Sequence, residues 1–549
     1  MSQTIKHNKL ILSALVITIV LAGMTFGNLP HPPVPVGIQT VNGTTFNFAD
    51  YPALNHEQIA IINYFNRLVT GQAVNSWAGW NAESYRWALQ YVSAFLAYTF
   101  AAFSETVSGY RTSLYEDFAF SQILRMNTTI AEYGNDSMEY YEWASIPGFT
   151  DYYYPNATHP DANDVYTGGF RGPANIMWTG HYALMMALYE RNFNAGAVVD
   201  ELRWYINDWE TSVTTNGFGT PKSGGIWGAG LIPCEPYIVF VQCNSIPIYT
   251  TELYDNLYET NYMESGMWDY GLSFIEENIT DDYGLYTNGY FVQKPVGWGP
   301  NAELLPQEIP GQAVDHLVGG PSLNSYGTAW ALTFLEYTIP DTTIPKYPAF
   351  IDAYSKDLSG DMMYMLGSYN RPTSFGDVFG ILGTLFTMTL ANQRGDYSTR
   401  DRLLNLLRDM VNAVWSPDGR EMYYDASSLD SFLSGVLSGF SVWSTLPVTV
   451  RDLADARPIG FWDYPYISAA DDDSIWVYQA RWDPDKSGFI LNIEVDSPAQ
   501  LTFSNFQDVP TAYSRGASMG ELSAGSGGDY ILTLQPGIYQ LVIMEGAQT

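Results

Sequence analysis

Twelve segments with helical apolar periodicity follow one another between residues 56 and 446, and this repetition constrains the fold most. The expected helices cover residues 56–72, 83–105, 110–128, 173–193, 197–212, 236–257, 262–278, 322–337, 347–366, 374–394, 398–415 and 429–446. Successive helices joined by short connections pair as hairpins. Six hairpins in succession predict a mainly α fold, an (α/α)6 barrel over residues 56–458, whose inner helices surround a central cavity.

After about residue 458 the helical pattern gives way to short stretches of alternating apolar and polar residues. Gly- and Asp-rich turns separate these stretches, which cover residues 475–481, 489–495, 500–503, 530–534 and 539–544. The pattern predicts a small C-terminal all-β sandwich domain over residues 459–549.

The N-terminus has the pattern of an export signal. Lys6 and Lys9 precede an apolar run over residues 10–26, which is nearly long enough to remain as a membrane anchor. We expect residues 1–27 to be a signal peptide or anchor, and the proline-rich residues 28–55 to be an extended linker. The protein is then periplasmic, extracellular or held on the outer face of the cytoplasmic membrane.

The charge of the chain limits its partners. The formal net charge is -34, because 58 acidic residues stand against 24 lysines and arginines. Nucleic acids are bound through Lys and Arg, so the composition argues against a nucleic-acid partner. Aromatic residues make up 15% of the chain, enough to line a pocket with rings.

Both cysteines of the chain, Cys234 and Cys243, flank a short apolar run. Proline suits the first position of a helix, so a helix is expected to begin at Pro236. At roughly 1.5 Å per residue, the Cα atoms of the two cysteines are then about 10 Å or more apart. A disulfide needs them within about 7 Å, so this geometry favours two thiols that face one cavity. The alternative is a disulfide, as in many secreted proteins.

The block Cys-Glu-Pro-Tyr-Ile-Val-Phe-Val-Gln-Cys-Asn-Ser, residues 234–245, resembles the signature of the linalool dehydratase-isomerase family. Two further blocks are similar to that family and occur in the same order, Asn-Ile-Met-Trp-Thr-Gly-His at 175–181 and Ser-Tyr-Gly-Thr-Ala-Trp at 325–330. The resemblance spans roughly residues 58–446. It implies an (α/α)6 barrel and a cofactor-independent dehydration, hydration or isomerisation of an alkenol or terpenoid alcohol.

The resemblance also implies the site residues. The catalytic residues would be Cys234, Cys243, His181, Tyr91 and Tyr326. The substrate-binding residues would be Glu235, Asn66, Phe240 and Trp178. Such groups can give a proton to a leaving hydroxyl and take one from a neighbouring C–H bond, while aromatic faces stabilise the developing cation. No metal or cofactor is expected, the partner is a small apolar alcohol or alkene, and the chain could form a homo-oligomer.

The sequence departs from the family at two positions. Asn66 stands where the family has an aspartate, and Gln72 stands near a family tyrosine. An asparagine amide can hold a hydroxyl by hydrogen bonds but cannot exchange a proton. We therefore expect weak dehydration of the family's own alkenols.

Two other functions remain open on the sequence alone. The first is a secreted carbohydrate-active hydrolase or lyase on the same kind of toroid, with Asp281 and Asp282 as candidate carboxylates. The second is a non-catalytic cell-surface binding protein. Substitution of the two cysteines separates the thiol mechanism from a glycosidase, because a glycosidase does not need them.

Overall fold

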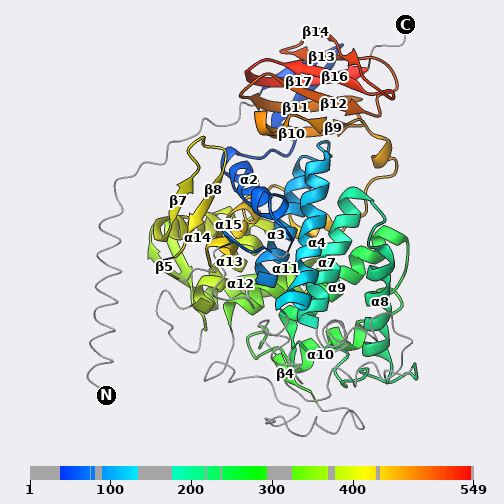
Figure 1. The fold of residues 1–549 in the computed structure, drawn as a ribbon. Coiled ribbons are helices and arrows are strands. Elements are labelled where there is room, and N and C mark those ends of the chain that lie inside the picture. The colour runs from blue at the N-terminus through cyan, green and yellow to red at the C-terminus, as the bar shows by residue number, and fades with distance from the viewer. Residues whose placement is uncertain are drawn as a thin grey trace.

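A computed structural model describes most of the chain between residues 37 and 545. The described residues are 37–74, 76–80, 89–133, 176–216, 219–234, 238–287, 289–292, 324–368, 378–427, 429 and 433–545. Figure 1 shows a helical body with a stack of sheets at one end. None of the described helices is both long and apolar enough to cross a membrane. The signal peptide or anchor expected at residues 1–27 lies outside the described residues.

Six helices contact one another in cyclic order, and we call them the helical ring. They are α3 (Leu89–Thr106), α7 (Ile176–Phe193), α9 (Val241–Tyr258), α11 (Ser325–Thr338), α13 (Val378–Gln393) and α15 (Leu433–Trp443). Each contacts the next, and α15 contacts α3, so the series closes. Helices α7 and α9 are buried on almost every side, as helices surrounded by other elements must be.

Other helices pack outside the helical ring. They are α2 (His56–Thr70), α4 (Ser113–Tyr133), α8 (Val199–Thr214), α12 (Pro340–Tyr354) and α14 (Tyr397–Met410), and each contacts at least one ring helix. Two further helices are α10 (Asp269–Asn278) and the short α16 (Val450–Leu453). Helix α14 buries one face, through residues such as Leu403 and Leu407, and exposes the other. This amphipathic pattern is typical of an outer layer.

Aromatic side chains fill the interior of the helical ring in layers. One layer brings together rings from α3, α11, α13 and α15, with contacting centroids 4.8–5.3 Å apart: Phe95, Trp330, Phe386 and Phe440. The next layer along consists of Tyr98, Phe334 and Trp443. The rings of one layer occupy comparable positions along their respective helices. The ring helices therefore run in the same direction, with the chain returning through an outer helix each time.

A close approach between two ring helices depends on one glycine. A Cβ atom added at Gly383 of α13 would overlap the hydroxyl of Ser325 in α11. A larger residue at 383 would therefore displace the Ser325 side chain or move α13 away from α11, whereas Gly380 lies against the backbone carbonyl of Met365.

Two antiparallel sheets form the stack. The five-stranded sheet has the order β10 (Ile475–Asp483), β11 (Gly488–Val495), β17 (Gly537–Glu545), β13 (Pro510–Ser514) and β14 (Ala517–Glu521). The four-stranded sheet has the order β15 (Ser523–Ala524), β16 (Tyr530–Leu534), β12 (Ala499–Ser504) and β9 (Tyr466–Ala470). Phe489 of one sheet meets Phe503 of the other edge to face, with centroids 5.4 Å apart, so the two sheets share an apolar interior.

A hairpin near the N-terminus covers the other face of the five-stranded sheet. Strands β1 (Ile38–Val41) and β2 (Thr44–Asn47) form it. Its Val41 and Phe46 pack against Ile490 and Val542, which point away from the sheet interior. The expectation of an extended linker over residues 28–55 is therefore wrong from residue 38 onward. Gln39 and Val41 at alternate positions of β1, together with Phe46 of β2, are buried, so this segment is a strand pair rather than a spacer.

The expected helices are confirmed in outline, but three of them give way to strands. The helix expected over 347–366 ends at residue 354 and is followed by β5 (Ser355–Ser359) and β6 (Met362–Met365). The helix expected over 398–415 ends at 410, and β7 (Asn412–Trp415) pairs with β8 (Met422–Asp425). The helix expected over 236–257 begins only at 241, after β3 (Ile238–Phe240), which pairs with β4 (Gly289–Phe291). Turn residues such as Gly360 and Gly419, the latter at φ +73°, interrupt the helical pattern.

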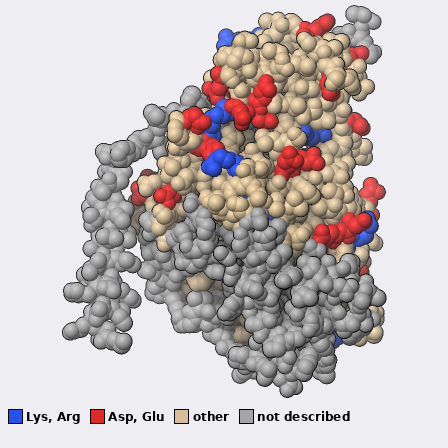
Figure 2. Space-filling view, viewed as in Figure 1, with Lys and Arg blue, Asp and Glu red and all other residues tan. Residues whose placement is uncertain are grey.

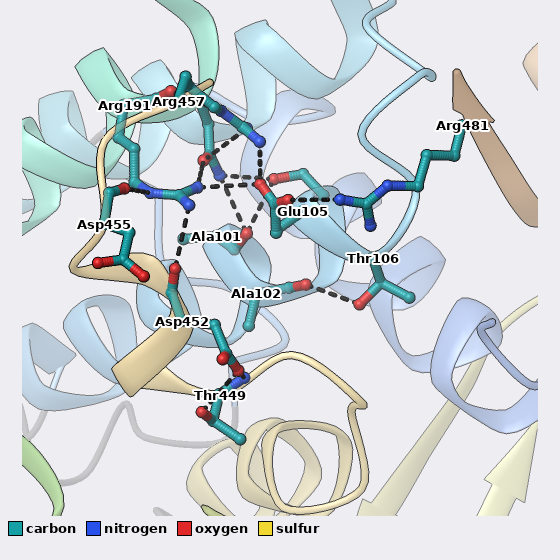
Figure 3. Close-up of polar contacts among 12 residues, drawn as sticks. Ala101, Ala102, Glu105, Thr106, Arg191, Thr449, Asp452, Asp455, Arg457 and Arg481 are labelled. Carbon is teal, nitrogen blue, oxygen red and sulfur yellow. Dashed lines mark hydrogen bonds and ion pairs between the residues drawn. The ribbon is translucent and has the colours of Figure 1, made fainter. Parts of the chain in front are cut away.

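A buried ion cluster joins the far end of α3 to the sheets (Figure 3). Glu105 of α3 contacts Arg457, Arg191 at 2.9 Å and, more loosely at 3.6 Å, Arg481 of β10. Burial alone would raise the pKa of Glu105, but the three guanidinium groups hold it below its usual value. Just beyond, the backbone N–H of Gly109 donates to the carbonyl of Ala480. The sheets thus attach to the end of the helical ring where α3 terminates.

Glu105→Gln should strongly destabilise the protein. The change keeps the shape but leaves Arg191 and Arg457 buried without a carboxylate, and loss of one member of a buried pair typically costs about 3–5 kcal/mol. The matched control is Asp200→Asn, whose partner Arg203 lies on the exposed face of α8. Chemical unfolding of the two variants and the wild type should show a large loss for Glu105→Gln only. Equal midpoints for the two variants would contradict this account.

Candidate active site

The first turns of the ring helices meet at the end of the helical ring that lies opposite the sheets. Tyr91 is in the first turn of α3, Met177 of α7, Cys243 of α9, Tyr326 of α11 and Phe379 of α13. The sheets contact α3 at its other end. Because the ring helices run in the same direction, residues far apart in the sequence come together here.

The two cysteines lie side by side at this end. Both are buried thiols, and their Sγ atoms are 2.9 Å apart. The wide separation expected from a helix beginning at Pro236 is wrong. The N–H of Cys234 instead donates to the carbonyl of Ile238, and α9 begins only at Val241.

Asn244 fixes the approach to the first cysteine. Its side-chain oxygen accepts from the N–H of Ile232, and its amide group donates to the carbonyl oxygens of Ile232 and Phe240, all at 2.9 Å. A single buried amide therefore satisfies three backbone groups of a segment without regular structure. It holds the segment before Cys234 against the first turn of α9, where Cys243 lies.

His181 lies one helical turn after Met177 in α7. The sulfur atom of Met177 is 3.9 Å from Cys243 Sγ. The His181 ring is buried, and its Nδ1 is 2.6 Å from the hydroxyl of Tyr98. Burial lowers the pKa of His181 to about 3, and burial raises the pKa of Tyr98 well above its usual value. Both groups are therefore neutral at pH 7.

The proton arrangement of this pair follows from acidity. A phenol is a better donor than a neutral imidazole, so Tyr98 donates to Nδ1 and the ring proton of His181 stands on Nε2. Nε2 has no hydrogen-bond partner among the described residues. A buried donor without a partner is rare and points to a place where a ligand would bind.

Aromatic rings enclose His181. The rings of Tyr91, Phe95 and Trp330 have centroids 5.9, 5.4 and 5.3 Å from the imidazole. Tyr326 lies one turn before Trp330, is half-buried, and stacks on Phe379 at 5.6 Å. The surroundings of the imidazole are thus apolar, with few polar groups.

Of the residues expected at the site, the structure places Cys234 beside Cys243 and Tyr91 beside His181, with Tyr326 at the same end of the ring. Met177, which contacts Cys243 and lies one turn before His181, connects the two pairs. Trp178 is on the wrong face for the expected contact with substrate. It stacks on Tyr182 at 4.6 Å, and Tyr182 meets Tyr205 of the outer helix α8. Met177 and His181, one turn apart, share the inner face instead.

Of the other expected substrate contacts, Phe240 and Asn66 have contacts away from the imidazole. Phe240 is buried against Gly289 of the neighbouring strand. Asn66 is on α2, outside the helical ring, and its side-chain oxygen accepts from the exposed Thr70. Glu235 lies outside the described residues.

The carboxylates considered for a glycosidase have a different local role. The side chain of Asp281 accepts from the N–H groups of Tyr283 and Leu285, as in a turn. Asp282 is exposed beside it. Within the described part of the chain, no group of three or more His, Cys, Asp or Glu is arranged to hold a metal ion.

Sequence reasoning missed three residues of this site: Tyr98, Met177 and Asn244. Signals for all three were present. Tyr98 is two helical turns after Tyr91, Met177 is one turn before His181, and Asn244 directly follows Cys243. Tyr98 and Met177 could have been found from the helical repeat of 3.6 residues per turn, because they lie on the same helix faces as Tyr91 and His181.

Comparison with known proteins identifies one segment of the chain. Residues 227–303, which include both cysteines, match the family model described as linalool dehydratase/isomerase.

Solved structures are similar only at a low level. A family 105 glycoside hydrolase from C. acetobutylicum ATCC 824 is 9% identical, with 73% of this chain and 97% of that chain covered and a TM-score of 0.39. An inactive variant of an α-1,6-mannanase from Salegentibacter sp. HEL1_6 is 10% identical, with 54% and 82% covered and a TM-score of 0.30. A β-L-arabinofuranosidase from Geobacillus stearothermophilus T6 is 14% identical, with 89% and 75% covered and a TM-score of 0.33. These values are too low to carry an argument about fold or activity.

His181 should make stability depend on pH. In the unfolded chain its imidazole takes up a proton below about pH 6.5, whereas the folded protein keeps it neutral until about pH 3. The buried neutral imidazole therefore makes its full contribution to the free energy of unfolding above about pH 6.5. This contribution falls by about 1.4 kcal/mol for each pH unit as the pH drops towards about 3. Urea unfolding at pH 7, 6 and 5 should show a steeper loss for the wild type than for His181→Asn. Parallel losses would contradict a buried neutral imidazole.

Proposed function

We propose that this chain is a cofactor-independent lyase or isomerase that acts on an alkenol or terpenoid alcohol by acid–base chemistry. The match of residues 227–303 to the linalool dehydratase/isomerase family supports this class of reaction. The observation that carries the proposal is the pair of buried thiols in that segment, Cys234 and Cys243, with sulfur atoms 2.9 Å apart.

A thiol pair that holds one proton can remove water from an alcohol without a cofactor. The protonated sulfur gives its proton to the substrate hydroxyl, the C–O bond breaks, and water leaves. A neighbouring C–H bond gives its proton to the other sulfur, and its electron pair forms the double bond. Transfer of that proton across the short contact between the sulfurs restores the pair. The reverse sequence is hydration, and return of water to the other allylic carbon is isomerisation.

His181 would orient the hydroxyl group. Because its imidazole is neutral, it cannot supply a full proton at pH 7, but its Nε2–H can donate a hydrogen bond to the substrate oxygen. Tyr98 would fix the ring and its tautomer through Nδ1. The faces of Tyr91, Phe95 and Trp330 would stabilise an allylic cation and disfavour its capture by water.

We also propose a domain organisation for the chain. The cyclic contacts of the helical ring and the outer helices support an (α/α)6 barrel over residues 56–458. The sheets would form a separate all-β sandwich domain over residues 459–549, to which the hairpin at residues 38–47 contributes. Export, with residues 1–27 as signal peptide or anchor, and assembly into a homo-oligomer remain proposals from the sequence.

The test is incubation with a panel of small alkenols and monoterpene alcohols, followed by gas chromatography. Cys234→Ser and Cys243→Ser should each lower turnover about a hundredfold to ten-thousandfold, because an acid–base group typically contributes that much. The matched control is Trp178→Phe, which should keep most of the activity because the Trp178 ring stacks on Tyr182. Undiminished alkenol conversion by the double cysteine variant would exclude the thiols from the mechanism. Sugar release by that variant would favour a glycosidase.

Both cysteines should be reduced in the active protein, since a disulfide has no proton to give. Alkylation under denaturing, non-reducing conditions followed by mass spectrometry should add two labels to each active chain. Treatment with a thiol oxidant should remove the labels and the activity together, and a reductant should restore both. Full activity in a fraction that carries no label would overturn the thiol mechanism.

A further inference from the structure

A polar cleft of about 860 Å³ lies at the end of the helical ring that is opposite the thiols. It opens where α11, α13 and α15 end, beside α16. The side chains that matter for its chemistry are Tyr337, Asn392, Gln393, Arg394, Arg400 and Arg451. Nothing in the proposed reaction uses this cleft.

Three arginines line this cleft, in a chain that has only 24 lysines and arginines against 58 acids. On the face shown in Figure 2, acidic groups outnumber basic ones. Pairs such as Arg408 with Glu57 at 2.8 Å and Arg402 with Asp357 at 2.7 Å match each cation to its own carboxylate. In the cleft, Arg400 pairs with Asp401 at 2.7 Å, but Arg394 and Arg451 do not follow this one-to-one pairing.

Arg394 and Arg451 share a single carboxylate, that of the buried Glu336. Arg394 Nε is 3.2 Å from one oxygen of Glu336, and Arg451 Nη1 is 3.5 Å from the other. Glu336 also accepts from the amide of Gln393 at 2.8 Å. Burial lowers the pKa of Arg394, against the opposing effect of Glu336. The group of two guanidiniums and one carboxylate therefore keeps one positive charge in excess.

Arg394 has unused hydrogen-bonding capacity. Its side chain is only 10% exposed, yet its Nη2 has no hydrogen-bond partner among the described residues. The side-chain oxygen of the adjacent Gln393 is likewise buried without a partner. A buried donor and a buried acceptor next to each other suit a ligand that carries both an anionic group and a hydroxyl group.

The acidic side chains of the cleft already accept hydrogen bonds from neighbouring groups. Asp452 accepts from the N–H and the hydroxyl of Thr449. Asp455 accepts from the hydroxyl of Tyr337 at 2.7 Å. Arg191 of the buried ion cluster donates to the backbone carbonyls of both aspartates, so this wall is fixed in place (Figure 3). These carboxylates do not supply the missing partner of Arg394.

We propose that this cleft binds a small hydroxylated oxyanion, a carboxylate or a phosphate ester, between Arg394 and Arg451. The planar guanidinium of Arg394 presents paired N–H donors that fit two oxygens of one anionic group. Arg451, whose side chain is 52% exposed, closes over the anion from the solvent side. Gln393 and the polar side chains beyond it accept from the hydroxyl groups of the ligand.

The test is calorimetric titration of the full chain with inorganic phosphate, and separately with citrate and glucose 6-phosphate, in low-salt buffer. We expect saturable binding of one anion per chain that weakens as chloride is added. Arg394→Gln should weaken binding by about tenfold or more, and Arg394→Lys should retain part of it. Tighter binding of citrate than of glucose 6-phosphate would assign the site to carboxylates, and the reverse order to phosphate esters.

Three controls keep the result unambiguous. Arg203→Gln, on the exposed face of α8, should bind as the wild type does. Cys243→Ser should also bind normally, so failure of the proposed reaction and failure of this site are distinguishable. If Arg394→Gln does not fold, the half-exposed Arg451→Gln serves in its place, with binding weakened several-fold. Absence of saturable binding of all three anions, or equal binding by the arginine variants, would overturn the proposal.

Discussion

The common direction of the six ring helices is the constraint on which the rest of the molecule depends. Each ring helix is followed by a return path on the outside, so every first turn of the ring lies at one end and every last turn at the other. Layers of aromatic rings such as Phe95, Trp330 and Phe440 fill the space between the ends. Packing of these rings buries a large apolar area and keeps the two ends apart.

Helix polarity gives the two ends different chemistry. The first turns carry partial positive charge and unpaired N–H groups, and Cys243 lies in the first turn of α9. The last turns carry partial negative charge, which favours cations, and Arg394 lies directly after the last residue of α13. Glu105, near the end of α3, goes against this rule and is stable there because arginines surround it.

Much of the helical part could be predicted from apolar periodicity, because long amphipathic or buried helices leave a clear pattern. The hairpins that follow α12 and α14 could not, since short strands after a helix continue its apolar spacing for a few residues. The cysteine geometry could not be predicted for a related reason: a proline favours a helix start at residue 236, and local sequence does not reveal that Ile238 pairs with Phe291 across the chain. The inward face of α7 could not be assigned to His181 rather than Trp178 from the motif alone, because adjacent helix positions point about 100° apart.

The hairpin near the N-terminus has a consequence for handling the molecule. Gln39 donates to the backbone carbonyl of Gln540 at 2.8 Å, so both ends of the described chain are held on the sheets (Figure 1). A bead or carrier joined at residue 38, or at residue 545, would therefore attach on the side of the sheets. Molecules immobilised in this way would present the first turns of the ring to the surrounding solution, in one orientation, whichever of the two positions is chosen.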